Sequence, residues 1–256
     1  SGSANVAIGF SSLIDNTIGQ SNVAIGAYAS GENTTGGSNV SIGVNALNYN
    51  ESGSSNVAIG RLSMQGASGQ SMTECTAVGH QSLYSITTGE HNSAFGVYAL
   101  YSNTDGIRNT AIGRSSSYSN TSGNRNTTLG RISNFYNQTG SNTVAIGQGA
   151  LFGTSGNSHD NNTAVGYESM YVVQTGSNNS TLGYHALKSL TTSSNNVAVG
   201  YSAGLQITDG AENVLMGKNA GRNGNVANNT YVGFEAGQGV SGSTNAGNNV
   251  GVGHSA

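Results

Sequence analysis

The 256-residue sequence has no proline and no tryptophan, and only 7% of its residues are charged, against about 25% in an ordinary soluble domain. The net charge is −3, and Lys and Arg are not clustered as nucleic-acid or membrane-surface binding requires. No apolar run is long enough for a transmembrane helix, and no signal peptide is recognisable. We therefore expect no nucleic-acid partner and no insertion into a membrane.

Cysteine is limited to Cys75, so no intrachain disulfide and no zinc site of the Cys/His type can form. The five histidines fall at different repeat positions, and the 11 acidic residues are dispersed. Calcium-binding β-roll motifs, phosphate-binding glycine loops and nucleophile elbows are missing as well. We expect no metal, no cofactor and no enzymatic activity.

Glycine, by contrast, is abundant, with 40 residues, and it closes a short motif typified by Asn-Val-Ala-Ile-Gly. Ten of the fourteen intervals between successive motif glycines are 17 residues, and the others are 19, 19, 16 and 20. Such self-similarity is the signature of a repeat protein, with the insertions placed in loops. The motif glycines are Gly9, Gly26, Gly43, Gly60, Gly79, Gly96, Gly113, Gly130, Gly147, Gly166, Gly183, Gly200, Gly217, Gly233 and Gly253.

The columns of this alignment are strongly patterned. An apolar residue always precedes the glycine, Ser or Ala always stands three positions after it, and Leu or Met is common four positions after it. Asparagine stands four positions before the glycine in all units except two, which carry Cys75 and Thr143. The asparagines are Asn5, Asn22, Asn39, Asn56, Asn92, Asn109, Asn126, Asn162, Asn179, Asn196, Asn213, Asn229 and Asn249.

The alternation in Asn-Val-Ala-Ile is that of a β-strand, and the glycine after it permits a bend. So short a strand needs a copy of itself beside it to bury its apolar face. We therefore predict an all-β parallel β-solenoid, a β-roll or β-helix of about 15 coils with a 17-residue repeat, as one domain over residues 1–256. In this interpretation Val and Ile stack into the core, whereas Asn and Ala share the other face.

The asparagine column has two interpretations. The first, which we favour, is a structural ladder whose side chains hydrogen-bond to one another and to turn backbone along the stack. The second is a polar binding strip. The Ser/Ala column indicates close packing against the opposite wall of the coil or against a neighbouring chain. Cys75, which replaces a ladder asparagine, is expected to be a buried, inert thiol.

Aromatic residues recur directly after the motif glycine, as at Tyr167, Tyr184 and Tyr201, and about five residues after it, as at Tyr84 and Tyr101. An aromatic stack is the favoured interpretation, and a sugar-binding platform is the alternative. Four Asn-x-Ser/Thr sequons share one loop position, and they would form a ridge of glycans in a eukaryotic protein. These sequons lie at Asn33, Asn50, Asn120 and Asn137.

Repeats such as Asn92-Ser93-Ala94-Phe95-Gly96 and Asn196-Val197-Ala198-Val199-Gly200 resemble those of bacteriophage tail-fibre proteins. Related Asn-x-Val-Ala-Ile-Gly units occur in the heads of trimeric autotransporter adhesins, where the repeat is nearer 14 residues. The resemblance covers nearly the whole chain. It implies an extracellular or virion-surface fibre, usually a homotrimer of parallel β-rolls.

We therefore expect a segment of a longer structural or adhesive fibre. Its partner would be the chain itself, in a homotrimer or a head-to-tail filament, and cell-surface carbohydrate is a further candidate. The alternatives are an ice-binding β-solenoid and a glycosylated subunit of an extracellular filament. An ice-binding face would need an unbroken outward row of Thr, whereas the candidate column, three before the glycine, mixes Val, Thr and Ser.

Overall fold

The computed structural model describes residues 2–225, 227–239 and 247–256. Within this part of the chain the fold is all-β, and each of the fifteen strands has three residues and ends directly before a motif glycine. The prediction of a parallel β-solenoid with a 17-residue repeat is confirmed. No helix in the described residues is long and apolar enough to cross a membrane. The chain divides into two compact units, Ser1–Asn126 and Thr127–Ala256, which are described separately.

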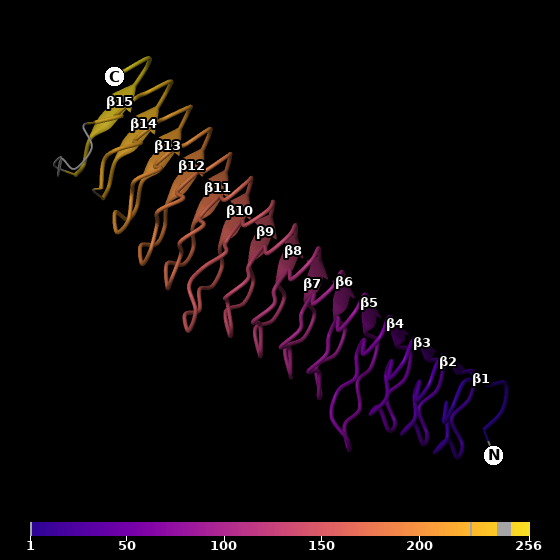
Figure 1. Ribbon diagram of the computed structural model, residues 1–256. Coiled ribbons are helices and arrows are strands. Elements are labelled where there is room, and N and C mark those ends of the chain that lie inside the picture. Colours follow the sequence, from indigo (N-terminus) through magenta and orange to yellow (C-terminus); the bar gives the residue numbers. More distant parts are fainter. Residues whose placement is uncertain (1, 226, 240–246) are drawn as a thin grey trace. The chain divides into compact units, whose positions relative to one another are not determined.

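The first unit stacks seven strands in chain order, each parallel to the next (Figure 1). Equivalent residues are partners, as in Val23↔Val40 and Ile25↔Ile42, so the register follows the repeat without slippage. The strands are β1 (Val6–Ile8), β2 (Val23–Ile25), β3 (Val40–Ile42), β4 (Val57–Ile59), β5 (Thr76–Val78), β6 (Ser93–Phe95) and β7 (Thr110–Ile112).

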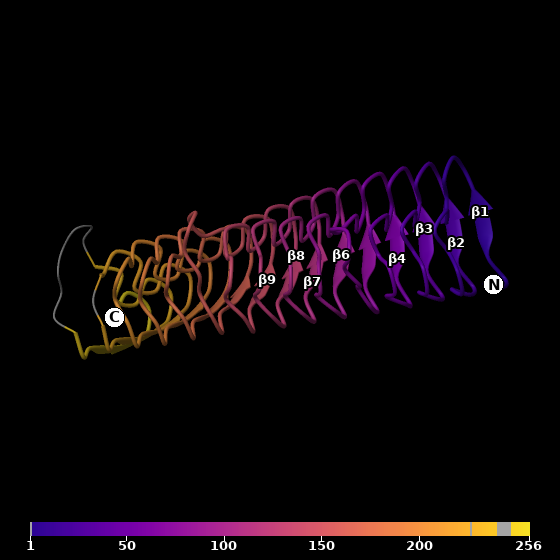
Figure 2. The same ribbon diagram turned by 90° about the horizontal axis from the view of Figure 1, so that it is seen from below.

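The second unit repeats this arrangement over eight strands, again parallel and in chain order (Figure 2). The strands are β8 (Thr127–Leu129), β9 (Val144–Ile146), β10 (Thr163–Val165), β11 (Ser180–Leu182), β12 (Val197–Val199), β13 (Val214–Met216), β14 (Thr230–Val232) and β15 (Val250–Val252).

The interior of the coils is the reverse of the sequence-based expectation. The prediction that Val and Ile form the core is wrong, because Ala24, in the middle of its strand, is fully buried whereas Ile42 and Ile59 are exposed. Alanine or another small residue faces inward because the opposite wall of a 17-residue coil lies close. That wall supplies the large core side chains, such as Leu47 and Leu100, which are fully buried.

The Ser/Ala column three residues after the glycine also lies inside the chain's own coil. Ala29, Ala46 and Ser63 are completely buried. Of the two surfaces proposed to pack against this column, the structure therefore supports the opposite wall of the coil. The narrow interior is filled by alanine, serine and one leucine or methionine per coil, together with the asparagine column.

The turns rely on backbone conformations that side chains usually avoid. In the coil around β3, Ser38, Asn45 and Leu47 all have positive φ, at 58°, 55° and 52°. A non-glycine residue in this region costs roughly 1 kcal/mol or more, so bonds to neighbouring coils must offset the cost. Asn45 N–H donates to Ala27 O at 2.9 Å, and Leu47 N–H donates to Ser63 O at 3.0 Å.

The motif glycine meets a stricter requirement. Gly43 has φ of +134°, and a Cβ built on it would lie 2.6 Å from Gly60 O in the next coil. We predict that Gly43→Ala lowers the free energy of unfolding by about 3 kcal/mol or more, measured as a shift of the urea midpoint. The matched control is Gly69→Ala in a surface loop. Its φ is +81° and nothing lies within 4 Å of the added Cβ, so its cost should be only about 1 kcal/mol. Equal costs for the two variants would contradict this description of the corner.

Candidate interaction surfaces

The outward face of each strand carries the residues one and three positions before the glycine. In the fifteen units these two columns hold only Val, Ile, Leu, Phe, Met, Thr and Ser, and no charged residue. Many of these side chains are open to solvent, among them Ile8 at 59% and Leu182 at 53% exposure. In the second unit a shallow depression on this face is lined by Thr163, Val165, Ser180, Thr181, Leu182, Val197 and Val199. The sequence pattern located this strip correctly on the strands but assigned it to the wrong side.

Aromatic rings five residues after the glycine stack along the first unit. The rings of Tyr84 and Tyr101 are 5.2 Å apart and nearly parallel, and those of Tyr101 and Tyr118 are 5.0 Å apart. The second unit continues the same column with Phe135, Phe152 and Tyr171, at centroid distances of 5.3 and 4.8 Å.

A second aromatic column, directly after the motif glycine, runs along the second unit. Tyr167, Tyr184 and Tyr201 stack at 5.2 and 5.1 Å. Lys218 Nζ then lies between two rings, 5.9 Å from Tyr201 and 5.4 Å from Phe234. Because neighbouring rings cover one another's faces, a ring inside a stack presents only its edge to a ligand. This arrangement matches the predicted stack and disfavours a sugar platform, which would need open ring faces.

The second unit also contains a compact cluster of charged side chains. Lys188 Nζ lies 2.6 Å from Glu168 Oε2, and His185 Nε2 lies 3.2 Å from the same oxygen. Burial, together with the charge of Lys188, lowers the pKa of His185. Partial burial would raise the pKa of Glu168, but hydrogen bonds from Lys188 and Tyr167 outweigh it and lower the pKa. The sequence analysis missed this cluster, although Glu168 and His185 are 17 residues apart, the spacing of neighbours in adjacent coils.

The asparagine column joins each coil to the next through both ends of its amide. Asn22 N–H donates to Asn5 Oδ1 at 2.9 Å, and Asn22 Nδ2 donates to Gly36 O at 2.8 Å. In the second unit, Asn179 N–H donates in the same way to Asn162 Oδ1 at 2.9 Å. Away from the first and last coils these asparagines are almost completely buried. A buried amide that meets its donors and acceptors in this way has no group left for a ligand.

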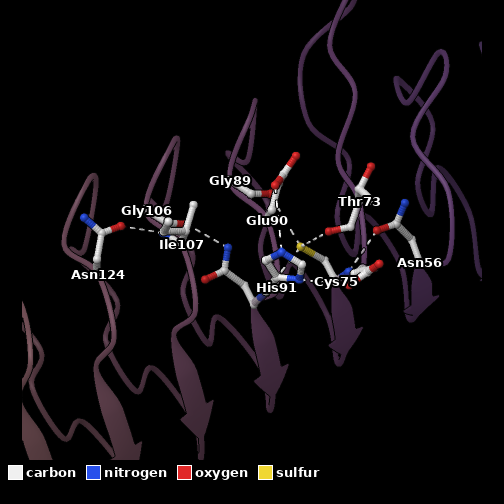
Figure 3. Close-up of polar contacts among 11 residues, drawn as sticks. Asn56, Thr73, Cys75, Gly89, Glu90, His91, Gly106, Ile107 and Asn124 are labelled. Carbon is white, nitrogen blue, oxygen red and sulfur yellow. Dashed lines mark hydrogen bonds and ion pairs between the residues drawn. The ribbon is translucent and has the colours of Figure 1, made fainter.

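Cys75 occupies one position of this column (Figure 3). Its N–H donates to Asn56 Oδ1 at 3.0 Å, and its Sγ accepts a long bond from Asn92 N–H at 3.4 Å. Its thiol lies 3.5 Å from Gly89 O, where a ladder asparagine would donate from Nδ2. Burial raises the pKa of the Cys75 thiol from 9.0 to about 11, so the thiolate is disfavoured at neutral pH and the thiol is chemically inert.

The four aligned sequon asparagines form a second internal column. Asn33, Asn50, Asn120 and Asn137 are at most 1% exposed, and Asn33 Nδ2, for example, donates to Gly36 O at 3.1 Å. An oligosaccharide cannot be attached to a buried amide nitrogen without opening the coil. The structure therefore argues against a ridge of glycans on the folded chain at this position.

His159 is the one buried histidine among the described residues, with 1% exposure. Its Nδ1 lies 3.3 Å from Asn162 Nδ2, and its Nε2 has no hydrogen-bond partner within the described part of the chain. Burial lowers the pKa of His159 from 6.5 to about 4, although the nearby charge of Asp160 opposes the shift. The ring is therefore neutral in the folded chain at neutral pH.

No group of three or more His, Cys, Asp or Glu side chains in the described residues is arranged to hold a metal ion. Comparisons with known proteins add no name, because no family model, no curated protein and no solved structure matches the chain. The class of molecule supported at this point is a β-solenoid repeat protein.

The Cys75 site provides a direct test of the asparagine column. Cys75→Asn should restore a strong acceptor for Asn92 N–H and a donor to Gly89 O. We expect the free energy of unfolding to rise by about 1 kcal/mol, measured by urea denaturation under reducing conditions. A variant no more stable than the parent would show that these bonds contribute little.

His159 predicts a pH dependence of stability. Because the folded-state pKa lies below 6.5, the neutral ring favours folding above that pH. This contribution is lost as the pH falls from 6.5 towards 4, at roughly 1 kcal/mol per unit. His159→Met should remove this part of the loss, and Met72, buried at the equivalent position of another 19-residue coil, shows that Met fits there. The measurement is unfolding of both proteins at pH 7 and pH 5. If they lose equal stability between these pH values, the assignment to His159 is wrong.

Proposed function

We propose that this chain is the structural subunit of a fibre and that copies of it associate through the outward strand faces. The observation that carries the proposal is the uncharged, largely apolar strip formed by the two outward columns of the strands. Soluble monomers rarely expose apolar patches of more than a few hundred Å², and larger patches usually mark interfaces. A net charge of −3 on a chain of this size opposes association only weakly.

A second copy is the occupant that fits this strip best. Every coil presents the same pair of outward positions at a step of about 4.8 Å, the spacing of paired strands. A partner with the same step can repeat each contact along the whole stack, as a second solenoid does. Both a closed homotrimer and an open filament use this surface. The proposed location outside the cell or on a virion, and an adhesive role towards carbohydrate, rest on the resemblance of the repeats to fibre and adhesin sequences.

An ice-binding solenoid is the second candidate, and one observation favours it. The column of Val, Thr and Ser three residues before the glycine points outward, and its members pair in register along the parallel strands. Regular spacing of this kind suits an ordered water layer. Thermal hysteresis of the dissociated protein distinguishes the two candidates, because a structural subunit should show none.

Charge placed on the strand face should prevent assembly. We predict that Ile42→Lys combined with Leu182→Lys converts the protein to a monomer of 25.8 kDa, because burying unpaired lysines at an interface is costly. Thr88→Lys combined with Thr175→Lys, on exposed loops, is the matched control and should assemble like the parent. Sedimentation velocity over a range of concentrations measures the result. A parent protein that stays monomeric at high concentration, or a strand-face variant that assembles normally, would refute the proposal.

A further inference from the structure

The insertions in the repeat are themselves periodic. The motif Gly-x-Ser-Gly occurs at Gly66–Gly69, Gly153–Gly156 and Gly239–Gly242, always in an enlarged coil. Successive copies are 87 and 86 residues apart, which corresponds to five coils. The third copy lies largely outside the described residues and remains an observation on the sequence. The chain is thus built from a five-coil unit in which one coil carries a special loop.

The two described loops have the same conformation. Gly66 and Gly69 have φ of 70° and 81°, and Gly153 and Gly156 have φ of 76° and 84°. Both loops begin with the same contact to the next coil, since the N–H groups of Gly66 and Gly153 donate to the carbonyl oxygens of Tyr84 and Tyr171, both at 3.0 Å.

The ends of the loops are anchored in matching ways as well. Ser71 Oγ lies 2.7 Å from Ser52 Oγ, and Ser158 Oγ lies 2.9 Å from Thr139 Oγ1. The next residue of each loop donates its N–H to an asparagine Oδ1 of the preceding coil, at 3.0 Å from Met72 to Asn50 and at 3.2 Å from His159 to Asn137. Such agreement marks a specified structure and not a slack insertion.

The tips of these loops face solvent and contribute little to their own coils. Ser68, Gly69, Ser155 and Gly156 are exposed, and nothing lies within 4 Å of a Cβ built on either glycine. The loop ends of the coils lie on the far side from the strands within each unit (Figure 1). A neighbour that contacts the tips is therefore a different neighbour from one that contacts the strand face.

A stack of near-identical coils has a register problem. Two such stacks lying side by side can shift by one coil, about 4.8 Å, and make almost the same contacts. A feature that recurs only every fifth coil removes this degeneracy, because successive tips are then about 24 Å apart within a continuous stack. A partner can meet successive tips identically only if it has the same five-coil step. A second copy of this chain has that step.

We propose that the Gly-x-Ser-Gly loops are contact points between laterally neighbouring copies of this chain and fix their axial register in steps of five coils. The inference rests on the proposed fibre function and adds a second contact surface to it. Glycine at the tip suits such a contact, because it lets another backbone approach closely.

The test compares tip variants with equivalent changes on ordinary loops. Ser68→Arg combined with Ser155→Arg adds bulk and charge at the exposed tips, whereas Thr88→Arg combined with Thr175→Arg does the same on loops of regular coils. Fibres of the full chain are imaged by electron microscopy after negative staining. We expect the parent and the control to form side-by-side bundles with an axial repeat of about 24 Å. The tip variant should form single fibres.

Three results are informative in different ways. Bundles of the tip variant with an unchanged repeat would overturn the loop proposal and leave the fibre proposal intact. Single fibres of the parent at every concentration would have the same consequence. A parent that forms no fibre would overturn both proposals.

Discussion

The amide of the ladder asparagine is the connection on which the rest of the structure depends. Its oxygen accepts the N–H of the next ladder residue, and its nitrogen donates to a carbonyl that closes a neighbouring loop, as Asn22 shows with Asn5 and Gly36. One side chain thereby links the strand, the loop and the adjacent coil. Each coil carries several residues at unfavourable positive φ and cannot hold its shape alone. Stacking through this ladder makes the conformation affordable.

The ladder also determines which side of the strand is inside. Because asparagine must reach the loop across the coil, it points inward, and the alternation of the strand places Ala24 inward and Val23 and Ile25 outward. Large core side chains then come from the opposite wall, as Leu47 does. The strand face is left uncharged and open, and this open face is the physical basis for proposing self-association.

Much of the fold was predictable, because the spacing of the motif glycines sets the coil and the alternation sets the strand. The orientation was not, since a period of two is the same for either face. The close opposite wall decides it, and the invariant small residue at Ala58 was the available signal. The aromatic stacks followed from the repeat columns. The cluster of Glu168, His185 and Lys188 requires reading between coils, where residues 17 apart become neighbours. The five-coil period required comparing the exceptions with one another.

The central claim is that Ala58 faces inward and Ile59 faces outward into an interface. Single cysteines at these two positions, in a Cys75→Asn background, test it through the rate of thiol labelling in the folded protein. At concentrations too low for assembly, the Ile59→Cys thiol should react rapidly and the Ala58→Cys thiol should be protected. On assembly, the thiol at position 59 should become protected as well. Rapid labelling at position 58 with protection at 59 in the monomer would contradict the account, as would a thiol at position 59 that stays reactive in the fibre.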